Sequence, residues 1–124
     1  MNGDPHSQSP LPPLSCQQIV YRAQLYKDWY KSGKVKKHAF MRMNKDADGV
    51  SVSLTVESCG EDLTDEFHGK LSLNVGRIRN LGLDVVADSP SHAVISGLPT
   101  RDENDALART LAEDLANMAR RVAE

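Results

Sequence analysis

The chain has 124 residues, of which 40% are hydrophobic and 26% are charged, values ordinary for one globular domain. The formal net charge is −2, so attraction to nucleic acid or to an anionic membrane would have to come from a local basic patch. No apolar run approaches the roughly 20 residues that span a bilayer, and the N-terminus lacks a signal-peptide pattern. We therefore expect a cytoplasmic protein with no membrane partner.

The cysteines and the composition of the N-terminal residues indicate the redox state and the domain boundaries. Cys16 and Cys59 form no C-x-x-C pair and are expected to be reduced thiols, with a single bridge between them as the alternative. Residues 1–15 are rich in Pro and Ser and predict a flexible arm. Residues 16–124 then predict a single folded domain.

A helix is predicted over residues 16–31. Ser15 is followed three residues later by Gln18, as in a capping box, and apolar residues recur at helical spacing up to the stop signal at Gly33. These apolar residues are Ile19, Ala23, Tyr26 and Tyr30. The β-formers between Val20 and Leu25 leave a strand as the alternative reading.

A β-hairpin is predicted within residues 35–56. Residues 38–43 alternate between two faces, and residues 50–56 alternate more cleanly, with Val50, Val52, Leu54 and Val56 on one face. Residues 44–49 between them carry turn chemistry that ends in Asp48-Gly49. This turn also resembles the start of a calcium-binding loop, but Thr55 occupies the position where such a loop needs a bidentate Glu. We therefore interpret residues 44–49 as a turn.

The rest of the chain continues the alternation of strands and turns. Polar, acidic residues 58–69 predict a loop or a short helical turn. Strands are predicted over residues 70–75, 83–87 and 92–96, a short helical turn over 77–82, and a turn over 88–91.

A long amphipathic helix is predicted over residues 101–123. Thr100 and Glu103 fit a capping box, and Arg120 and Arg121 suit the negative end of the helix dipole. The apolar stripe predicts packing on the sheet, with a coiled-coil partner as the alternative. This stripe contains Leu107, Leu111, Leu115, Met118 and Val122.

Together these elements predict an α+β fold. We expect a mainly antiparallel sheet of four to five strands with two packed helices, of which the C-terminal one is long and amphipathic.

A basic and aromatic edge is the leading candidate for a functional surface. Lys and Arg side chains contact phosphates or acidic groups, and exposed aromatic rings stack on unpaired bases. This edge predicts a small non-catalytic binding or regulatory module whose partner is a protein or a nucleic acid. Its residues are Trp29, Tyr30, Lys34, Lys36, Lys37, His38, Phe40 and Arg42.

The alternative is a small enzyme acting on a nucleotide or another phosphate-bearing substrate. His38 or His92 would move a proton, and Arg22 or Arg42 would bind the anion. His68 could join them only if the fold brings the three segments together. No metal-ligand spacing or cofactor motif is recognised, so no metal site and no cofactor are predicted. An exposed sheet edge or the final helix could also complete a homo-oligomer.

Four short segments together resemble a small bacterial protein family with no settled activity. They are Gly33-x-Val35-x-x-x-Ala39-Phe40, Ser51-Val52, Gly82-Leu83 and His92-Ala93-Val94-Ile95. The resemblance covers roughly residues 26–95 and implies a bacterial domain complete in itself. None of the four segments is a catalytic signature.

Overall fold

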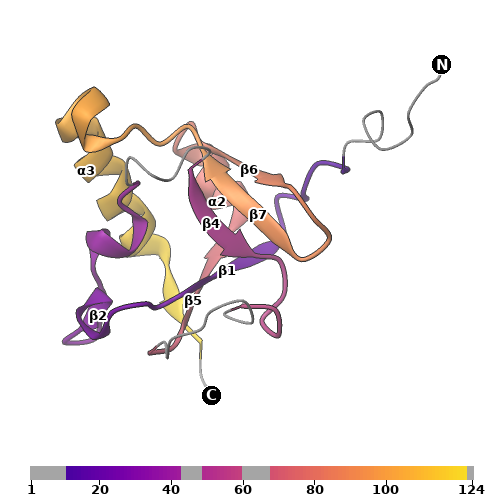
Figure 1. The fold of residues 1–124 in the computed structure, drawn as a ribbon, viewed down its shortest axis with the longest axis horizontal. Helices are drawn as coiled ribbons and strands as arrows, with labels where there is room; N and C mark the ends of the chain where they lie inside the picture. Colours follow the sequence, from indigo (N-terminus) through magenta and orange to yellow (C-terminus); the bar gives the residue numbers. More distant parts are fainter. Residues whose placement is uncertain (1–10, 43–48, 60–67, 123–124) are drawn as a thin grey trace.

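The computed structural model describes residues 11–42, 49–59 and 68–122. These residues form an α+β fold in which an antiparallel sheet packs against one long and one short α-helix (Figure 1). In chain order the elements are β1 (Ile19–Ala23), the 3₁₀ turn η1 (Lys27–Trp29), β2 (Tyr30–Lys31), β3 (Lys34–Val35), the 3₁₀ turn η2 (Lys37–Phe40), β4 (Val50–Ser53), β5 (Lys70–Asn74), α2 (Val75–Asn80), β6 (Asp84–Ala87), β7 (His92–Ser96), α3 (Arg101–Met118) and β8 (Arg120–Arg121).

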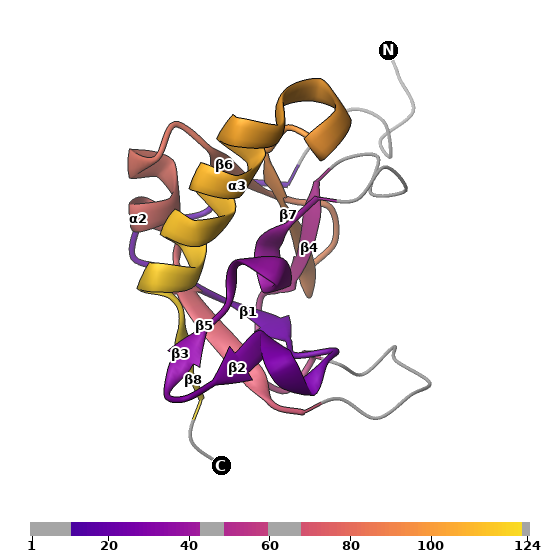
Figure 2. The same cartoon turned by 90° about the vertical axis from the view of Figure 1, so that its left-hand side faces the viewer.

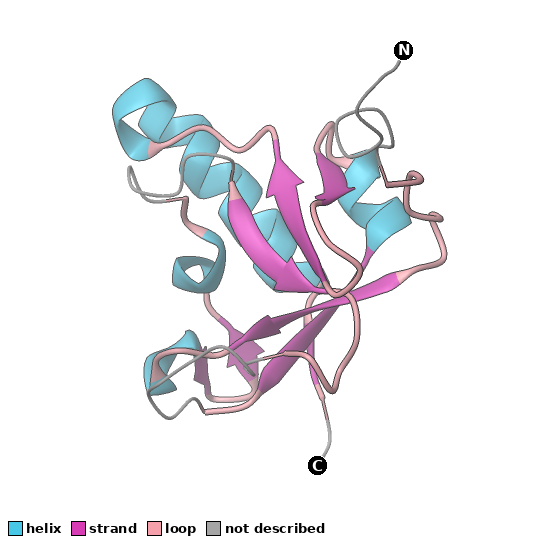
Figure 3. Cartoon of the chain, turned by 45° about the vertical axis from the view of Figure 1, so that its right-hand side comes forward, coloured by secondary structure: helices cyan, strands magenta, loops and turns pink. Residues whose placement is uncertain are grey.

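Within the described residues, the main sheet has six strands in the order β6-β7-β4-β1-β5-β8, which is more than the four to five predicted because β1 and β8 join it. β2 and β3 form a separate two-stranded sheet. Every neighbouring pair is antiparallel. β1 and β4 are linked through the single register pair Tyr21–Ser53, whereas β1 pairs with β5 along its whole length. The strands β1 and β5 therefore cross the direction of β4 and β7 steeply (Figure 3).

One face of the main sheet carries the core. Alternation places Val50 and Val52 of β4 on the buried side and Ser51 on the exposed side, because successive side chains of a strand point to opposite faces. Helix α3 lies over this buried side, as the views in Figures 1 and 2 both show. Fully buried members of the resulting core include Val20, Phe40, Leu71, Ile78, Ile95 and Leu115.

The start of α3 is held by reciprocal hydrogen bonds. The Glu103 N–H donates to Thr100 Oγ1 at 3.2 Å, and the Thr100 N–H donates to Glu103 Oε1 at 2.9 Å. The Thr100 N–H and, second, the Thr100 hydroxyl, which donates to Glu103 Oε1 at 3.2 Å, hold the pKa of Glu103 below its usual value. Asn104 is extended within α3, and its Oδ1 accepts the Leu107 N–H at 3.1 Å, so it acts as a second cap.

Replacing Thr100 with alanine is expected to lower the free energy of unfolding by about 1 kcal/mol, because the Glu103 N–H loses its side-chain acceptor. Urea denaturation followed by circular dichroism measures this loss. Thr110→Ala is the matched control, since Thr110 is an exposed threonine inside the same helix and alanine is the better helix former there. A loss in Thr110→Ala as large as in Thr100→Ala would contradict the capping role.

The predicted helix over residues 16–31 is wrong, and the strand alternative over Val20–Leu25 is close to what the structure contains. Ser15 Oγ accepts the Gln17 N–H at 3.1 Å, which closes a turn instead of capping a helix. Residues 19–23 then pair with β5 as β1, and η1 and β2 follow. Pairing with a strand some fifty positions away outweighs the local helical spacing, as tertiary context commonly does.

The predicted hairpin within residues 35–56 is also wrong. Residues 37–40 form η2, with both Ala39 and Phe40 buried, so residues 38–42 of the predicted first strand do not form a strand. The second strand is confirmed in part as β4, which pairs with β1 and β7. The calcium-like positions 44–48 lie outside the described residues, as does most of the predicted loop over 58–69.

The remaining predictions hold more closely. The strands over 70–75, 83–87 and 92–96 are confirmed as β5, β6 and β7, and the helical turn over 77–82 as α2, which begins two residues earlier. The C-terminal helix is confirmed, but it ends at Met118 and not at residue 123. The chain then becomes extended at Ala119 and forms β8, which pairs with β5.

Candidate functional site: a basic groove between the β2–β3 hairpin and the end of α3

A groove of about 350 Å³ lies between the β2–β3 hairpin and the segment that joins α3 to β8. In Figure 2, β3 and β8 are seen together at the C-terminal end of α3. The lining residues come from two distant parts of the chain: Tyr30, Gly33, Lys34 and Val35 from the first, and Ala116, Asn117, Ala119, Arg120 and Arg121 from the second.

The hairpin wall is fixed by a two-residue loop. Ser32 and Gly33 have φ values of 56° and 76°, which is the left-handed geometry that tight hairpins need at both central positions. Lys31 pairs with Lys34 on either side of this loop, and Tyr30 pairs with Val35. The loop therefore places the exposed Lys34 at the mouth of the groove.

The opposite wall is fixed by Arg120. Its Nη1 donates to the carbonyl oxygens of Asn117, Met118 and Ala119 at 3.1, 3.3 and 3.0 Å. These carbonyls belong to the last turn of α3 and the residue after it, where a cation is stabilised by unpaired helix carbonyls. One guanidinium thus ends the helix and borders the groove.

Arg121 joins the two walls. Its guanidinium carbon lies 5.0 Å from the centre of the Tyr30 ring, a cation–π contact, and its Nη2 donates to the His68 carbonyl at 2.7 Å. Gly69 leaves room for this side chain, because a Cβ at that position would lie 2.9 Å from Arg121 Nε. The Tyr30 ring is therefore covered by a cation.

The groove is electrostatically one-sided. Its lining contains Lys34, Arg120 and Arg121 and no acidic residue. Among the described residues, no carboxylate lies within ion-pair distance of these three cations. The ion pairs between described residues use other cations: Arg42, Arg79, Arg101, Arg109 and, when it is protonated, His92. Val35, Ala116 and Ala119 supply apolar surface beside the charges. This arrangement suits a ligand with an anionic group and a small apolar part.

No family model, curated protein or solved structure matches this chain. Of the helices in the described ranges, none is long and apolar enough to cross a membrane.

The structure brings only part of the predicted basic and aromatic edge to this groove. Tyr30 and Lys34 line it. Trp29 and Phe40 lie in the core. The guanidinium carbon of Arg22 lies 5.2 Å from the centre of the Trp29 ring. The rings of Trp29 and Phe40 offer little surface for stacking on a partner.

The other predicted contact residues lie on or near η2. Lys36 and Lys37 are half-buried and His38 is exposed. Arg42 Nη1 donates to the Leu98 carbonyl at 2.6 Å and lies 3.6 Å from Glu103 Oε1. Arg42 thereby ties the exit of η2 to the start of α3.

The two candidate proton carriers, His38 and His92, do not lie together. His38 is on η2, which packs against α3, whereas His92 lies on the face of the sheet that points away from the core and contacts Asp88 through Nδ1 at 2.7 Å. Arg22 donates to the carbonyls of Ala39 and Ser51. Within the described ranges, no group of three or more His, Cys, Asp or Glu side chains could hold a metal ion.

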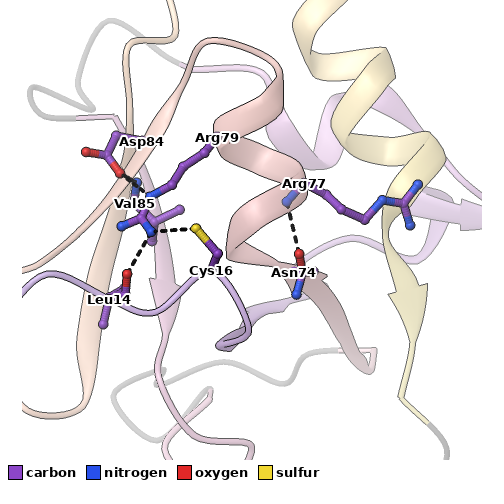
Figure 4. A network of polar contacts seen from close by, with 7 residues as sticks. All are labelled: Leu14, Cys16, Asn74, Arg77, Arg79, Asp84 and Val85. Carbon is purple, nitrogen blue, oxygen red and sulfur yellow. Dashed lines mark hydrogen bonds and ion pairs between the residues drawn. The ribbon is translucent and has the colours of Figure 1, made fainter.

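A second polar network surrounds Arg79 (Figure 4). Its guanidinium donates to Asp84 Oδ1, the Leu14 carbonyl and Cys16 Sγ at 2.9, 2.7 and 3.3 Å. The Arg79 hydrogen bond, followed by the Val85 N–H, lowers the pKa of Asp84. The network fastens the segment before β1 to α2 and β6.

Cys16 and Cys59 are both free thiols, as expected.

Sequence reasoning missed most of the second wall of the groove. The sequence marks Arg120 and Arg121 only as charges favourable at a helix end, and it gives no functional signal for Ala116 or Asn117. Two adjacent arginines after an apolar helix are the trace in the sequence that could have indicated this wall.

Proposed function

We propose that this protein is a small non-catalytic binding module of the cytoplasm that holds an anionic partner in the basic groove. The observation that carries the proposal is the set of three cations, Lys34, Arg120 and Arg121, with no carboxylate of the described chain in ion-pair range. Two free thiols fit a reducing compartment.

The charge of the whole molecule sharpens this proposal. A net charge of −2 repels polyanions at long range, so attraction must be local and depend on a few side chains. Lys34 is the best side chain to change, because it is exposed and no hydrogen bond of its side chain supports the fold within the described residues. Arg120 and Arg121 also hold the helix end and the Tyr30 ring, so changing them would alter the groove itself.

Lys34→Glu is expected to weaken binding of labelled polyanions at least about fivefold, since reversing one charge costs on the order of 1 kcal/mol or more near a surface. The probes are polyglutamate and a single-stranded oligonucleotide, followed by fluorescence anisotropy at low and high salt. Binding should weaken steeply with salt.

Arg77→Glu is the matched control. Arg77 is exposed on α2 and does not line the groove, yet its substitution changes the net charge by the same amount. Equal losses in both variants would mean that only net charge matters. Failure of both probes to bind at low salt would refute the proposed function.

A further inference from the structure

The two walls of the groove include the edges of two sheets. β3 pairs with β2, and β8 is the outermost strand beside β5 in the part of the chain that the structure describes. An unpaired strand edge offers backbone donors and acceptors to another extended chain. The groove therefore combines backbone hydrogen-bonding capacity with positive charge.

The register of the hairpin shows which backbone groups are directed outward. The Lys36 N–H donates to the Trp29 carbonyl at 2.7 Å, so these two residues form a hydrogen-bonded pair. Antiparallel pairs alternate, and the preceding pair, Tyr30–Val35, is therefore a non-hydrogen-bonded one. The N–H and carbonyl of Val35 consequently point away from β2.

The edge of β8 also directs backbone groups outward. The Val122 N–H donates to the Lys70 carbonyl at 2.8 Å, which makes the adjacent Leu71–Arg121 pair a non-hydrogen-bonded one. The backbone groups of Arg121 are thus directed away from β5. Val35 and Arg121 both line the groove.

We propose that the groove binds an extended acidic peptide segment of a partner protein, which pairs as an added strand with the outer edge of β3. This inference rests on the proposed function and names its partner class. The peptide backbone bonds to Val35, and its carboxylates approach Lys34, Arg120 and Arg121. Its small apolar side chains contact Ala116 and Ala119 at the end of α3.

Charge complementarity alone would also admit a nucleic acid, but the aromatic side chains oppose it. Binding of unpaired bases depends on exposed aromatic faces. Tyr30 is the aromatic residue that lines the groove, and the guanidinium of Arg121 lies over its ring. Trp29 and Phe40 are buried.

The test uses a labelled parent peptide in which Asp and Val alternate, and an oligothymidylate of equal length. Two further versions of the peptide are N-methylated at every second amide, one on the Asp amides and the other on the Val amides. N-methylation removes backbone donors and keeps every charge. We expect the parent peptide to bind and at least one methylated version to bind about tenfold more weakly, because hydrogen bonds to the strand edge are lost. The Val35 amide should become protected from hydrogen exchange when the parent peptide is bound.

Two results would overturn the inference while leaving the proposed function intact. One is equal affinity of all three peptides, which would indicate binding by charge alone. The other is an oligothymidylate that binds more tightly than the parent peptide. If neither peptide nor oligothymidylate binds at low salt, the proposed function fails as well.

Discussion

Replacing Gly49 with alanine is expected to lower the free energy of unfolding by about 4 kcal/mol, a large part of the stability of a small domain. Gly49 has a φ of 129°, and a Cβ there would lie 2.1 Å from the Ile95 carbonyl oxygen and 3.0 Å from Val94 Cγ1. The adjacent Val50 is paired with Ile95, so the strands β4 and β7 cannot separate to relieve this contact without losing their pairing. Urea denaturation measures the loss.

Gly82→Ala separates the contact from the backbone strain. Gly82 also has a positive φ, 86°, but a Cβ there would meet no atom within 4 Å. Its replacement should cost only about 1 kcal/mol, the penalty of a left-handed conformation. Equal losses at the two positions would contradict the close approach of Gly49 to β7.

Phe40→Ala is expected to destabilise the protein by about 3–5 kcal/mol, because it removes a large, fully buried ring from the core. Phe40 ends η2, the turn that packs against α3, so the cavity would lie between these two elements. Thermal and urea unfolding measure the effect. Phe40→Leu should lose only a part of this stability, since leucine restores most of the apolar volume.

Lys37→Ala provides the comparison on the same turn. Lys37 is half-buried and positively charged, and its replacement should change the free energy of unfolding by no more than about 0.5 kcal/mol. If Phe40→Ala left stability unchanged and weakened partner binding, Phe40 would be a surface contact and its place in the core would be refuted.

The elements predicted correctly are those in which the local sequence pattern matches the pattern of burial in the fold. In β5 and β7 alternate residues are buried, and Thr100 with Glu103 makes the predicted capping box of α3. In these segments the apolar residues that indicated a structure are also the ones that the fold buries.

The segment from residue 16 to 31 shows why other predictions failed. The helical stripe joined Ile19 to Tyr26, yet both are exposed, and the structure buries Val20, Gln24 and Trp29. Pairing with β5 decides this outcome, and no window confined to residues 16–31 contains that information. Likewise, β8 has two residues, too few for any periodicity.

The candidate site was predicted only in part for a related reason. Lys34 and Tyr30 belong to a visible basic and aromatic cluster, but their partners Arg120 and Arg121 lie at the other end of the sequence. Charge clusters in sequence indicate which side chains are available. The fold alone determines which of them face the same cavity.

The separation of the two walls along the chain has a consequence for measurement. A ligand that filled the proposed site would contact residues of both segments, 30–35 and 116–121, and would therefore bind the folded chain in preference to the unfolded one. By mass action it would add about 2.7 kcal/mol to the stability of the whole fold at a concentration one hundred times its dissociation constant. An upward shift in melting temperature would therefore report occupancy of the groove for a compound with no label and no known activity.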